Sequence, residues 1–541
     1  NIVSSHSMAR QRLNNMQDEA EQLFSLSKSA LEKNQMATAI DVCRTLNTKF
    51  PSHFAGWLLA GRIHLKLHKP EAGLISTARA STIKPNQPEI LMQRAECLSL
   101  LNRDDEALEI LEYLAEGDFP TAQLHADVAM MLSAKQLHQS AIVHYQKAII
   151  LNNKIAGLHY NLAAAYRFIG DFTECERALE CAIRLDPLDS EAQMMRSSLR
   201  LQTPEKNHID DLLDAYSRVE EDDKIKSGLC YAIAKEQDDL NNLDASFTYL
   251  SEGASIRRRR MIYDVERDEQ IMQRIAETFQ PRRHRPAPVN KEAPKPIFIV
   301  GLPRTGSTML ERMLDSHSDV RSMGELDTLG AALTKHSITQ TNVSPTTAED
   351  LVERASSVDL KALAQTYISD SIPQNFTESF FIDKLPLNFL YLGLIHQSMP
   401  DAKIIHIKRH PVASCFAIYR QWFRDIYPFS YDLIDLARYF VAYKKLTDFW
   451  QSHMPDAIHT VEYERLVEQP EVELRKVLAF CGLPWEQNVL AFHENTSPST
   501  TASAVQVRQP IHSKSKERWR RYASHLTPLI EALEMEGIDV A

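Results

Sequence analysis

A glycine-containing segment in the second half of the chain has the residue types of an anion-binding loop. An apolar run at residues 297–300 precedes GLPRTGST at residues 301–308, and a helical pattern follows over residues 309–314. A strand, a tight loop and a helix start turn backbone N–H groups toward an anion, and Gly301 and Gly306 allow it to approach closely. The loop residues predicted to bind it are Arg304, Thr305, Gly306, Ser307 and Thr308.

The spacing of this loop equals that of the nucleotide P-loop, but one residue differs. Ser307 stands where the P-loop has its lysine, which contacts the β- and γ-phosphates beside a magnesium ion. The cation inside this loop is Arg304 instead. A P-loop kinase or nucleoside triphosphatase is therefore an alternative whose main obstacle is the missing lysine.

The segment PIFIVGLPRTGSTMLERML resembles the 5′-phosphosulfate-binding loop of sulfotransferases. It is most similar to the branch that contains protein-tyrosine sulfotransferases and bacterial proteins that fuse tetratricopeptide repeats to such a domain. The resemblance extends from Pro296 to about Leu529. It implies a P-loop-like α/β domain with a central parallel sheet, which uses 3′-phosphoadenosine-5′-phosphosulfate (PAPS) as sulfuryl donor and needs no metal.

Further segments resemble the parts of this family that hold the rest of the nucleotide. KIIHIKRHP at residues 403–411 is similar to the 3′-phosphate site, which implies that Arg409 pairs with that phosphate. VEYERL at residues 461–466 resembles the segment whose tyrosine, here Tyr463, lies against the nucleotide. A third match, to the loop that closes over the cofactor, implies contacts from Ser503, Gln506, Arg508 and Arg518.

The second phosphate site departs from the family pattern at two positions. The family has a serine or threonine eight residues after the arginine, where this chain has Ala417. Ser414 lies one turn earlier on the same helical face and is expected to substitute for it. Gln421 replaces another basic position.

The resemblance also implies the residues that carry out the transfer. Glu325 matches the general base and Lys384 the donor to the bridging oxygen, while Ser503 assists and Arg304 lies at the sulfuryl group. His317 and His336 are alternative bases, since other sulfotransferases use histidine. Enzymes that act on acidic tyrosine peptides have basic residues after the glutamate, but this chain has LDTL at residues 326–329. The expected acceptor is a hydroxyl of protein tyrosine, which the resemblance implies, or alternatively of a small molecule or glycan, which the sequence after the glutamate favours.

The first half of the chain repeats every 34 residues. Small residues recur at two positions, because two helices cross there and a long side chain would force them apart. One position holds Gly61, Ala95, Ala129 and Ala163, and the other Ala39, Gly73, Ala107, Ala141 and Cys175. A large position holds Leu23, Trp57, Leu91, His125 and His159, whose histidines are predicted to pack rather than to bind a ligand.

These units resemble the tetratricopeptide repeat, and a longer sixth unit follows through Tyr231 to Tyr249. Such arrays form a superhelix whose concave groove captures a peptide substrate or protein partner, or they serve only as a scaffold. A repeat-based binding scaffold with a degenerate nucleotide fold is thus a further alternative. A Pro- and Arg-rich stretch at residues 280–296 marks a linker. The predicted organisation is a repeat array at residues 8–260, a linker at 261–296 and a sulfotransferase domain at 297–541.

Composition limits the compartments and partners that are expected. The net charge of −11 argues against general nucleic-acid binding, which needs a basic surface. Seven scattered cysteines without metal-ligand spacing fit reduced thiols in the cytoplasm. No apolar stretch is long enough to cross a membrane, so no membrane partner is expected.

Overall fold

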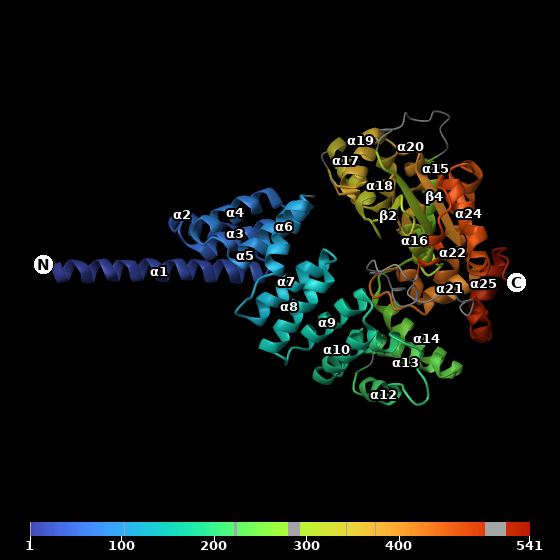
Figure 1. Cartoon of the computed structure of the whole chain (residues 1–541), viewed down its shortest axis with the longest axis horizontal. Helices are drawn as coiled ribbons and strands as arrows, with labels where there is room; N and C mark the ends of the chain where they lie inside the picture. Colours follow the sequence, from blue (N-terminus) through green and yellow to red (C-terminus); the bar gives the residue numbers. More distant parts are fainter. Residues whose placement is uncertain are drawn as a thin grey trace. The chain divides into compact units, whose positions relative to one another are not determined.

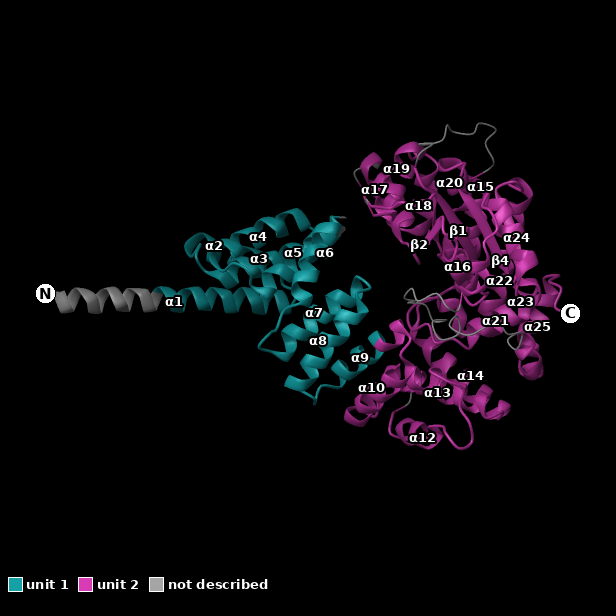
Figure 2. Cartoon of the chain, in the orientation of Figure 1, with its two compact units in different colours: residues 1–165 teal, residues 166–541 magenta. Residues whose placement is uncertain are grey.

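The computed structural model describes residues 2–101, 103–220, 224–279, 293–341, 343–373, 375–492 and 516–541. The chain forms two compact units, residues 1–165 and residues 166–541 (Figure 2). The second unit contains both the end of the repeat region and the sheet domain. The domain boundaries given above, which rest on the linker composition, stay a prediction.

Unit 1 is an array of antiparallel helices. Its helices are α1 (Ile2–Glu32), α2 (Met36–Lys49), α3 (Phe54–Lys66), α4 (Pro70–Ile83), α5 (Pro88–Leu100), α6 (Asp104–Ala115), α7 (Ala122–Ala134), α8 (His138–Leu151) and the start of α9 (Ala156–Ile169). Consecutive helices pack in pairs, for example α3 with α4 and α7 with α8. This is the helical-hairpin repeat that the 34-residue period predicts.

The recurring small residues lie where helices touch. Ala39, Ala107 and Ala141 are fully buried. A Cβ atom added at Gly73 would lie 2.6 Å from the Sγ atom of Cys97, closer than packed atoms allow. The period of small residues is therefore set by the close approach of neighbouring helices.

In several repeats, the residue at the large position also fixes the turn that precedes the first helix of that repeat. Trp57, His159 and Gln193 each donate a side-chain hydrogen bond to the backbone carbonyl six residues earlier, at 2.9, 3.1 and 3.1 Å. His125 instead accepts from the N–H of Phe119 at 3.2 Å. The repeat histidines are thus structural, as the sequence predicts.

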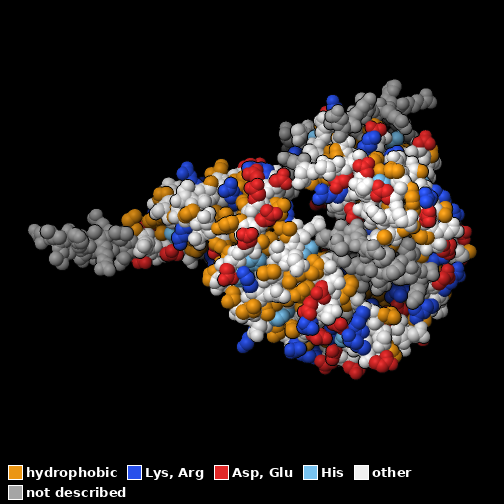
Figure 3. All heavy atoms as spheres, viewed as in Figure 1, with side chains coloured by type: hydrophobic (Ala, Val, Ile, Leu, Met, Phe, Trp, Pro, Cys, Tyr) orange, Lys and Arg blue, Asp and Glu red, His pale blue; other side chains and the backbone are white. Residues whose placement is uncertain are grey.

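On the face drawn in Figure 3, hydrophobic side chains gather over the part of unit 1 that contains α7 and α8. The large apolar residues exposed on these two helices include Met130, Val143, Ile150 and Leu151. An exposed apolar patch of this kind is typical of a protein interaction surface.

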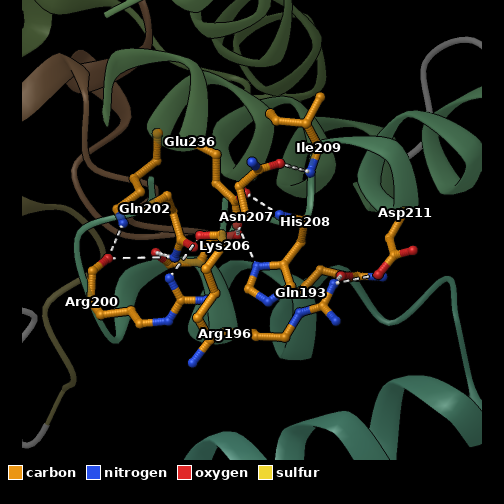
Figure 4. Close-up of polar contacts among 12 residues, drawn as sticks. Gln193, Arg196, Arg200, Gln202, Lys206, Asn207, His208, Ile209, Asp211 and Glu236 are labelled. Carbon is orange, nitrogen blue, oxygen red and sulfur yellow. Dashed lines mark hydrogen bonds and ion pairs between the residues drawn. The ribbon is translucent and has the colours of Figure 1, made fainter. Parts of the chain in front are cut away.

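Unit 2 begins with the remaining repeat helices. They are α10 (Phe172–Leu185), α11 (Ser190–Ser198), α12 (Ile209–Ser217), α13 (Lys224–Asp239) and α14 (Leu243–Arg260), followed by α15 (Val265–Thr278). Between α11 and α12 the chain runs irregularly, and the buried Glu236 of α13 fixes this stretch. Its carboxylate accepts from Ser197 Oγ at 2.6 Å and from the backbone N–H and Nδ1 of His208 at 2.7 and 2.9 Å (Figure 4).

The second half of unit 2 is an α/β domain around a five-stranded parallel sheet (Figure 1). The strands are β1 (Lys295–Gly301), β2 (Val320–Ser322), β3 (Phe380–Asp383), β4 (Lys403–Lys408) and β5 (Ile458–Glu462), in the order β2-β3-β1-β4-β5. In the register of the sheet, Ile297 of β1 pairs with Ile382 of β3, and Gly301 of β1 pairs with Ile407 of β4. The chain leaves β1 toward one edge of the sheet and later leaves β4 toward the other, so the topological switch point lies between these two strands.

The helices of this domain cover both faces of the sheet. They are α16 (Ser307–Asp315), α17 (Thr328–Thr341), α18 (Ala348–Ala355), α19 (Leu360–Ser371), α20 (Leu392–Ser398), α21 (Pro411–Tyr419), α22 (Leu433–His453), α23 (Tyr463–Glu468), α24 (Pro470–Cys481) and α25 (Thr527–Met535), with short 3₁₀ turns η1 (Pro386–Tyr391), η2 (Pro428–Tyr431), η3 (Gln487–Leu490) and η6 (Arg518–Tyr522). Ile297 and Ile299 pack against α16 and α24, whereas Phe298 and Val300 pack in the core that contains α19 to α22. Because alternate residues of a strand face opposite sides, β1 is buried on both.

The last repeat hairpin shares the core of the sheet domain. Tyr231, Leu250 and Ala254 belong to the same buried cluster as Phe298 and Trp450. A linear reading of the sequence, which places the repeats and the sheet on either side of a linker, does not anticipate this shared core.

Polar contacts reinforce this junction between α14 and the sheet domain. Arg257 Nη2 donates to the carbonyl of Arg424 at 2.8 Å and to Asp425 at 2.5 Å, and Arg258 pairs with Asp435 at 2.7 Å. Buried apolar surface and paired charges therefore join the last hairpin to the sheet. Among the residues described, no helix is both long and apolar enough to cross a membrane.

Candidate active site

The predicted anion loop lies at the carboxyl end of β1, beside the switch point. Thr305 is buried, and its hydroxyl donates to the carbonyl of Leu302 at 2.7 Å, which holds the loop in a turn. Ser307 and Thr308 begin α16, so the positive end of that helix faces the loop. The structure thus forms the strand, loop and helix that the sequence predicts.

Two backbone positions show how tightly the loop is built. Gly306 has φ +98°, and a Cβ atom there would lie 2.5 Å from the Tyr463 ring. Arg304 also has a positive φ, +64°, although it is not glycine. Strained conformations of this kind concentrate at functional sites, where the surrounding structure holds them in place.

Arg409 follows β4 and reaches back to the loop. Its Nη1 donates to the Arg304 carbonyl at 3.1 Å, and its guanidinium lies 4.7 Å from the centre of the Tyr463 ring. The loop, Arg409 and Tyr463 therefore meet at the carboxyl ends of β1, β4 and β5. Open α/β sheets bind ligands at such an edge.

Arginines from separate segments form a positively charged cluster here. Burial and the neighbouring Arg409, Arg420 and Arg518 lower the pKa of Arg304 to about 10. The pKa of Arg518 is lowered most by the nearby Arg420. Burial lowers the pKa of Arg409, and Arg420 lowers it further. Each shift shows that a guanidinium sits in the positive field of the others, which is the field that attracts a polyanion.

The predicted catalytic pair is in direct contact. Lys384, which follows β3, has a side chain only 1% exposed, and its Nζ hydrogen-bonds Oε1 of Glu325. The Glu325 side chain is 45% exposed, so one end of this ion pair is reachable from solvent. A buried cation next to an accessible carboxylate suits a step in which one group stabilises negative charge and the other takes a proton.

A second carboxylate, which the sequence reading did not single out, lies beside this pair. Glu311 of α16 is buried, and its Oε2 lies 3.7 Å from Lys384 Nζ. Ser322 Oγ donates to its Oε1 at 2.6 Å. Burial raises the Glu311 pKa, while the nearby Lys384 opposes that rise. Its position on the same helical face as Ser307, four residues later, was the signal available in the sequence.

The roles of several predicted site residues in binding the cofactor stay predictions. Ser503, Gln506 and Arg508 lie outside the described residues. Arg518 lies in η6 and joins the arginine cluster. Ser414 is buried and donates to the carbonyl of Arg409 at 3.2 Å, so here it supports that arginine.

A charged residue, Arg420, lies close in the sequence to the two positions that depart from the family pattern. Ala417 lies on α21, and Gln421 follows the helix directly after Arg420. Arg420 therefore supplies positive charge one residue from the basic position that the chain lacks. The sequence reading passed over it because the family pattern points to position 421.

The two histidines considered as alternative bases have structural partners. His317 is buried, with Nε2 3.0 Å from the carbonyl of Pro484 and Nδ1 accepting from the N–H of Asp319 at 3.1 Å. His336 Nε2 lies 2.9 Å from the Thr366 hydroxyl. These contacts engage both ring nitrogens of His317. Within the described ranges no group of three or more His, Cys, Asp or Glu side chains is placed to hold a metal.

Comparison with known families gives one match in each half of the chain. Residues 296–487 match the Sulfotransferase family, and residues 156–187 match the Tetratricopeptide repeat. The chain therefore carries a sulfotransferase-family domain behind tetratricopeptide repeats, which confirms the resemblance and the fold class predicted from the sequence. An uncharacterized protein of Aquifex aeolicus is 27% identical over 466 residues, which are 83% of this chain and 60% of that protein.

Two further matches each cover less than half of this chain. A putative protein-tyrosine sulfotransferase of Caenorhabditis briggsae is 28% identical over 241 residues, 41% of this chain and 80% of its own length. Among solved structures, the sulfotransferase domain from the Synechococcus PCC 7002 olefin synthase covers 48% of this chain and all of its own, with 22% identity and a TM-score of 0.32.

Proposed function

We propose that the chain transfers the sulfuryl group of PAPS to an acceptor hydroxyl. One observation carries the proposal: the helix-capped loop after β1 lies between the Lys384–Glu325 pair after β3 and the arginine cluster around Arg409 after β4, at the carboxyl ends of the strands. The loop and the cluster are two separate candidate anion-binding elements. PAPS has phosphate groups at both its 5′ and 3′ ends, so it needs two such elements. A nucleoside triphosphate carries its phosphates in one chain.

The residues present fit this donor. The loop has no room for a side chain at Gly306, which leaves backbone N–H groups to meet the 5′-phosphosulfate. Arg409, Arg420 and Arg518 supply the positive field for the 3′-phosphate. The donor is a substrate of the reaction and is consumed: its sulfur–oxygen bond to the 5′-phosphate breaks as the acceptor oxygen bonds to sulfur.

Each group of the catalytic pair then has one task. Glu325 accepts the proton of the acceptor hydroxyl as that oxygen attacks. Lys384 Nζ donates a hydrogen bond to the 5′-phosphate oxygen, which leaves with the electron pair of the broken bond. Glu311 keeps a carboxyl group beside Lys384 when Glu325 turns to the acceptor. Arg304 and the start of α16 stabilise the charge on the sulfuryl oxygens.

Two acceptor classes compete. The names of several relatives favour protein tyrosine, including the putative protein-tyrosine sulfotransferase of Caenorhabditis briggsae. The neutral and acidic sequence after Glu325 favours a small molecule or glycan over an acidic tyrosine peptide. We propose that the repeats bind a protein substrate or partner, which the exposed apolar residues of α7 and α8 support.

Thermal denaturation with nucleotides tests the donor directly. Adenosine 3′,5′-bisphosphate, the product that remains after transfer, is expected to raise the melting temperature without magnesium, because it binds only the folded state. ATP with magnesium is the matched comparison and is expected to do so much less. Equal stabilisation by both would refute the proposal and favour a kinase or triphosphatase. Binding of neither nucleotide would favour the scaffold alternative.

A further inference from the structure

A carboxylate from the repeat region lies inside the arginine cluster. Asp238, in the last turn of α13, has a side chain only 1% exposed. Arg420 Nη2 donates to its Oδ2 at 2.6 Å, and Arg518 Nη1 lies 3.6 Å from the same oxygen. Oδ1 accepts from the Tyr522 hydroxyl at 2.6 Å and lies 3.5 Å from Arg521 Nη1. Both oxygens are thus engaged by groups that lie far along the chain.

Two other acidic residues of the same helix end behave differently. Glu236 holds Ser197 and His208 (Figure 4). Asp239 accepts from the N–H of Gln202 at 2.9 Å and from Lys235 at 2.6 Å. Their partners belong to the repeat region, whereas those of Asp238 belong to the sheet domain and its C-terminal segment.

The carboxylate of Asp238 is kept charged by this arrangement. Burial acts to raise its pKa, but Arg420, Arg518, the Tyr522 hydroxyl and Arg521 outweigh burial and lower it. One carboxylate does not neutralise three guanidinium groups, so positive charge remains for an anion. An arginine has five N–H donors in a planar fork, and one that bonds to Asp238 keeps others for a phosphate.

We propose that Asp238 is a positioning residue that holds Arg420 and Arg518 for the 3′-phosphate, so that the last repeat completes the donor site. This inference rests on the proposed function and deepens it. An arginine fixed before the ligand arrives loses less side-chain freedom on binding, which strengthens the contact. The shared core keeps α13 in place relative to the sheet. Arg420 thereby compensates for the missing basic residue at Gln421.

The test compares two ligands that differ only in the 3′-phosphate. Affinities for adenosine 3′,5′-bisphosphate and adenosine 5′-monophosphate would be measured by calorimetry on the full chain, well below its melting temperature. The wild type is expected to prefer the bisphosphate. Asp238→Asn keeps the shape and removes the charge, so it is expected to lose about tenfold of this preference. Arg420→Lys, which keeps the charge and loses the fork, is expected to lose a similar share.

Glu236→Gln is the matched control, since it alters an equally buried carboxylate of the same helix that contacts only repeat residues. It is expected to lower the melting temperature while leaving the preference within about twofold. If Asp238 had only a structural role, Asp238→Asn would likewise lower the melting temperature and leave the preference for the bisphosphate unchanged.

The outcomes separate this inference from the proposed function. A wild type without preference for the bisphosphate refutes the proposed function. A wild-type preference that persists or increases in a folded Asp238→Asn refutes the positioning role. If Asp238→Asn does not fold, Arg420→Lys decides: an unchanged preference refutes the inference, and a tenfold loss supports it.

Discussion

The two anion-binding regions proposed for the sulfotransferase domain are built in different ways. The loop at residues 301–308 is one continuous segment, held by its own backbone and by the helix that follows it. The second region is assembled from Arg409, Arg420 and Arg518, with Asp238 from the repeats as a common partner of two of them. The first depends on local backbone geometry, and the second on side chains brought together by the tertiary fold.

This difference predicts which contacts a change will affect. A change in the loop alters the backbone that any 5′-phosphate meets, so it is expected to weaken every nucleotide. A change in the arginine cluster alters side-chain charge at one place, so it is expected to affect only ligands with a second phosphate. Proton removal from the acceptor should depend mainly on the Lys384–Glu325 pair, which the strand order places on the other side of the loop from Arg409.

The largest effect is expected from Glu325→Gln, which separates chemistry from both binding regions. The amide keeps the shape and removes the proton acceptor, so turnover should fall roughly 10²–10⁴-fold. Binding of adenosine 3′,5′-bisphosphate should stay nearly intact. Initial rates with a panel of tyrosine peptides and phenols would measure the fall, with Asp327→Asn as the control. Full activity in Glu325→Gln, together with loss in His317→Gln or His336→Gln, would show that a histidine is the base.

Gly306→Ala should have the next largest effect and should disable the loop for all nucleotides. The residue has φ +98°, and the added Cβ would meet the Tyr463 ring at 2.5 Å. Backbone strain of about 1–3 kcal/mol corresponds to roughly a fivefold to 150-fold loss of affinity for the bisphosphate and the monophosphate alike. Gly537→Ala is the control, since Gly537 has φ +73° with open space around it. A loss confined to the bisphosphate would contradict the division of roles between the two regions.

Arg409→Ala should weaken the bisphosphate about tenfold and leave the monophosphate much less changed. A charge-assisted hydrogen bond to the 3′-phosphate contributes roughly 1.5–3 kcal/mol. The guanidinium also supports the loop through the Arg304 carbonyl, which accounts for a smaller loss with the monophosphate. Calorimetry with both ligands measures the difference. Arg438→Ala removes a solvent-exposed arginine paired with Glu269 and should change neither affinity. An unchanged bisphosphate affinity in Arg409→Ala would place the 3′-phosphate site elsewhere.

The smallest effect is expected in unit 1 and concerns pH. His125 and His144 are buried with their Nδ1 atoms 2.9 Å apart, and His144 Nε2 donates to the carbonyl of Ala115 at 3.0 Å. Because His125 accepts from Phe119, each ring nitrogen has a partner only while both rings are neutral. Burial lowers the pKa of each, and for His125 the nearby His144 and Lys147 lower it further.

A histidine whose pKa is lower in the folded state binds its proton more readily in the unfolded chain. Stability from this pair is therefore full above about pH 6.5 and is lost as the pH falls below that unfolded value. Hydrogen exchange of α7 and α8, corrected for its intrinsic pH dependence, should accelerate between pH 7.5 and 5.5. Helix α5, which contains no histidine, is the internal control. Equal protection of α7 and α8 at both pH values would contradict the prediction.

Much of the architecture follows from local patterns that a sequence displays. The 34-residue period of small residues predicts the hairpin array, because each position marks a contact between helices close in the chain. The apolar run at residues 297–300 and the glycines after it predict the strand and the loop, since backbone conformation there is set by neighbouring residues. Glu325 and Lys384 are found through the family resemblance, and the fold brings them into contact.

Local residue patterns therefore account for the separate elements: the repeats, the loop and the strands. Tertiary structure alone decided how the second anion region is completed, because Asp238 and Arg420 lie 182 residues apart and neither belongs to a motif. An acidic residue near the end of a helix, in the run Lys235 to Asp239, looks like a solvated surface charge. Only the packing of the last repeat hairpin onto the sheet domain buries one of these carboxylates among arginines, where its charge acts on the site.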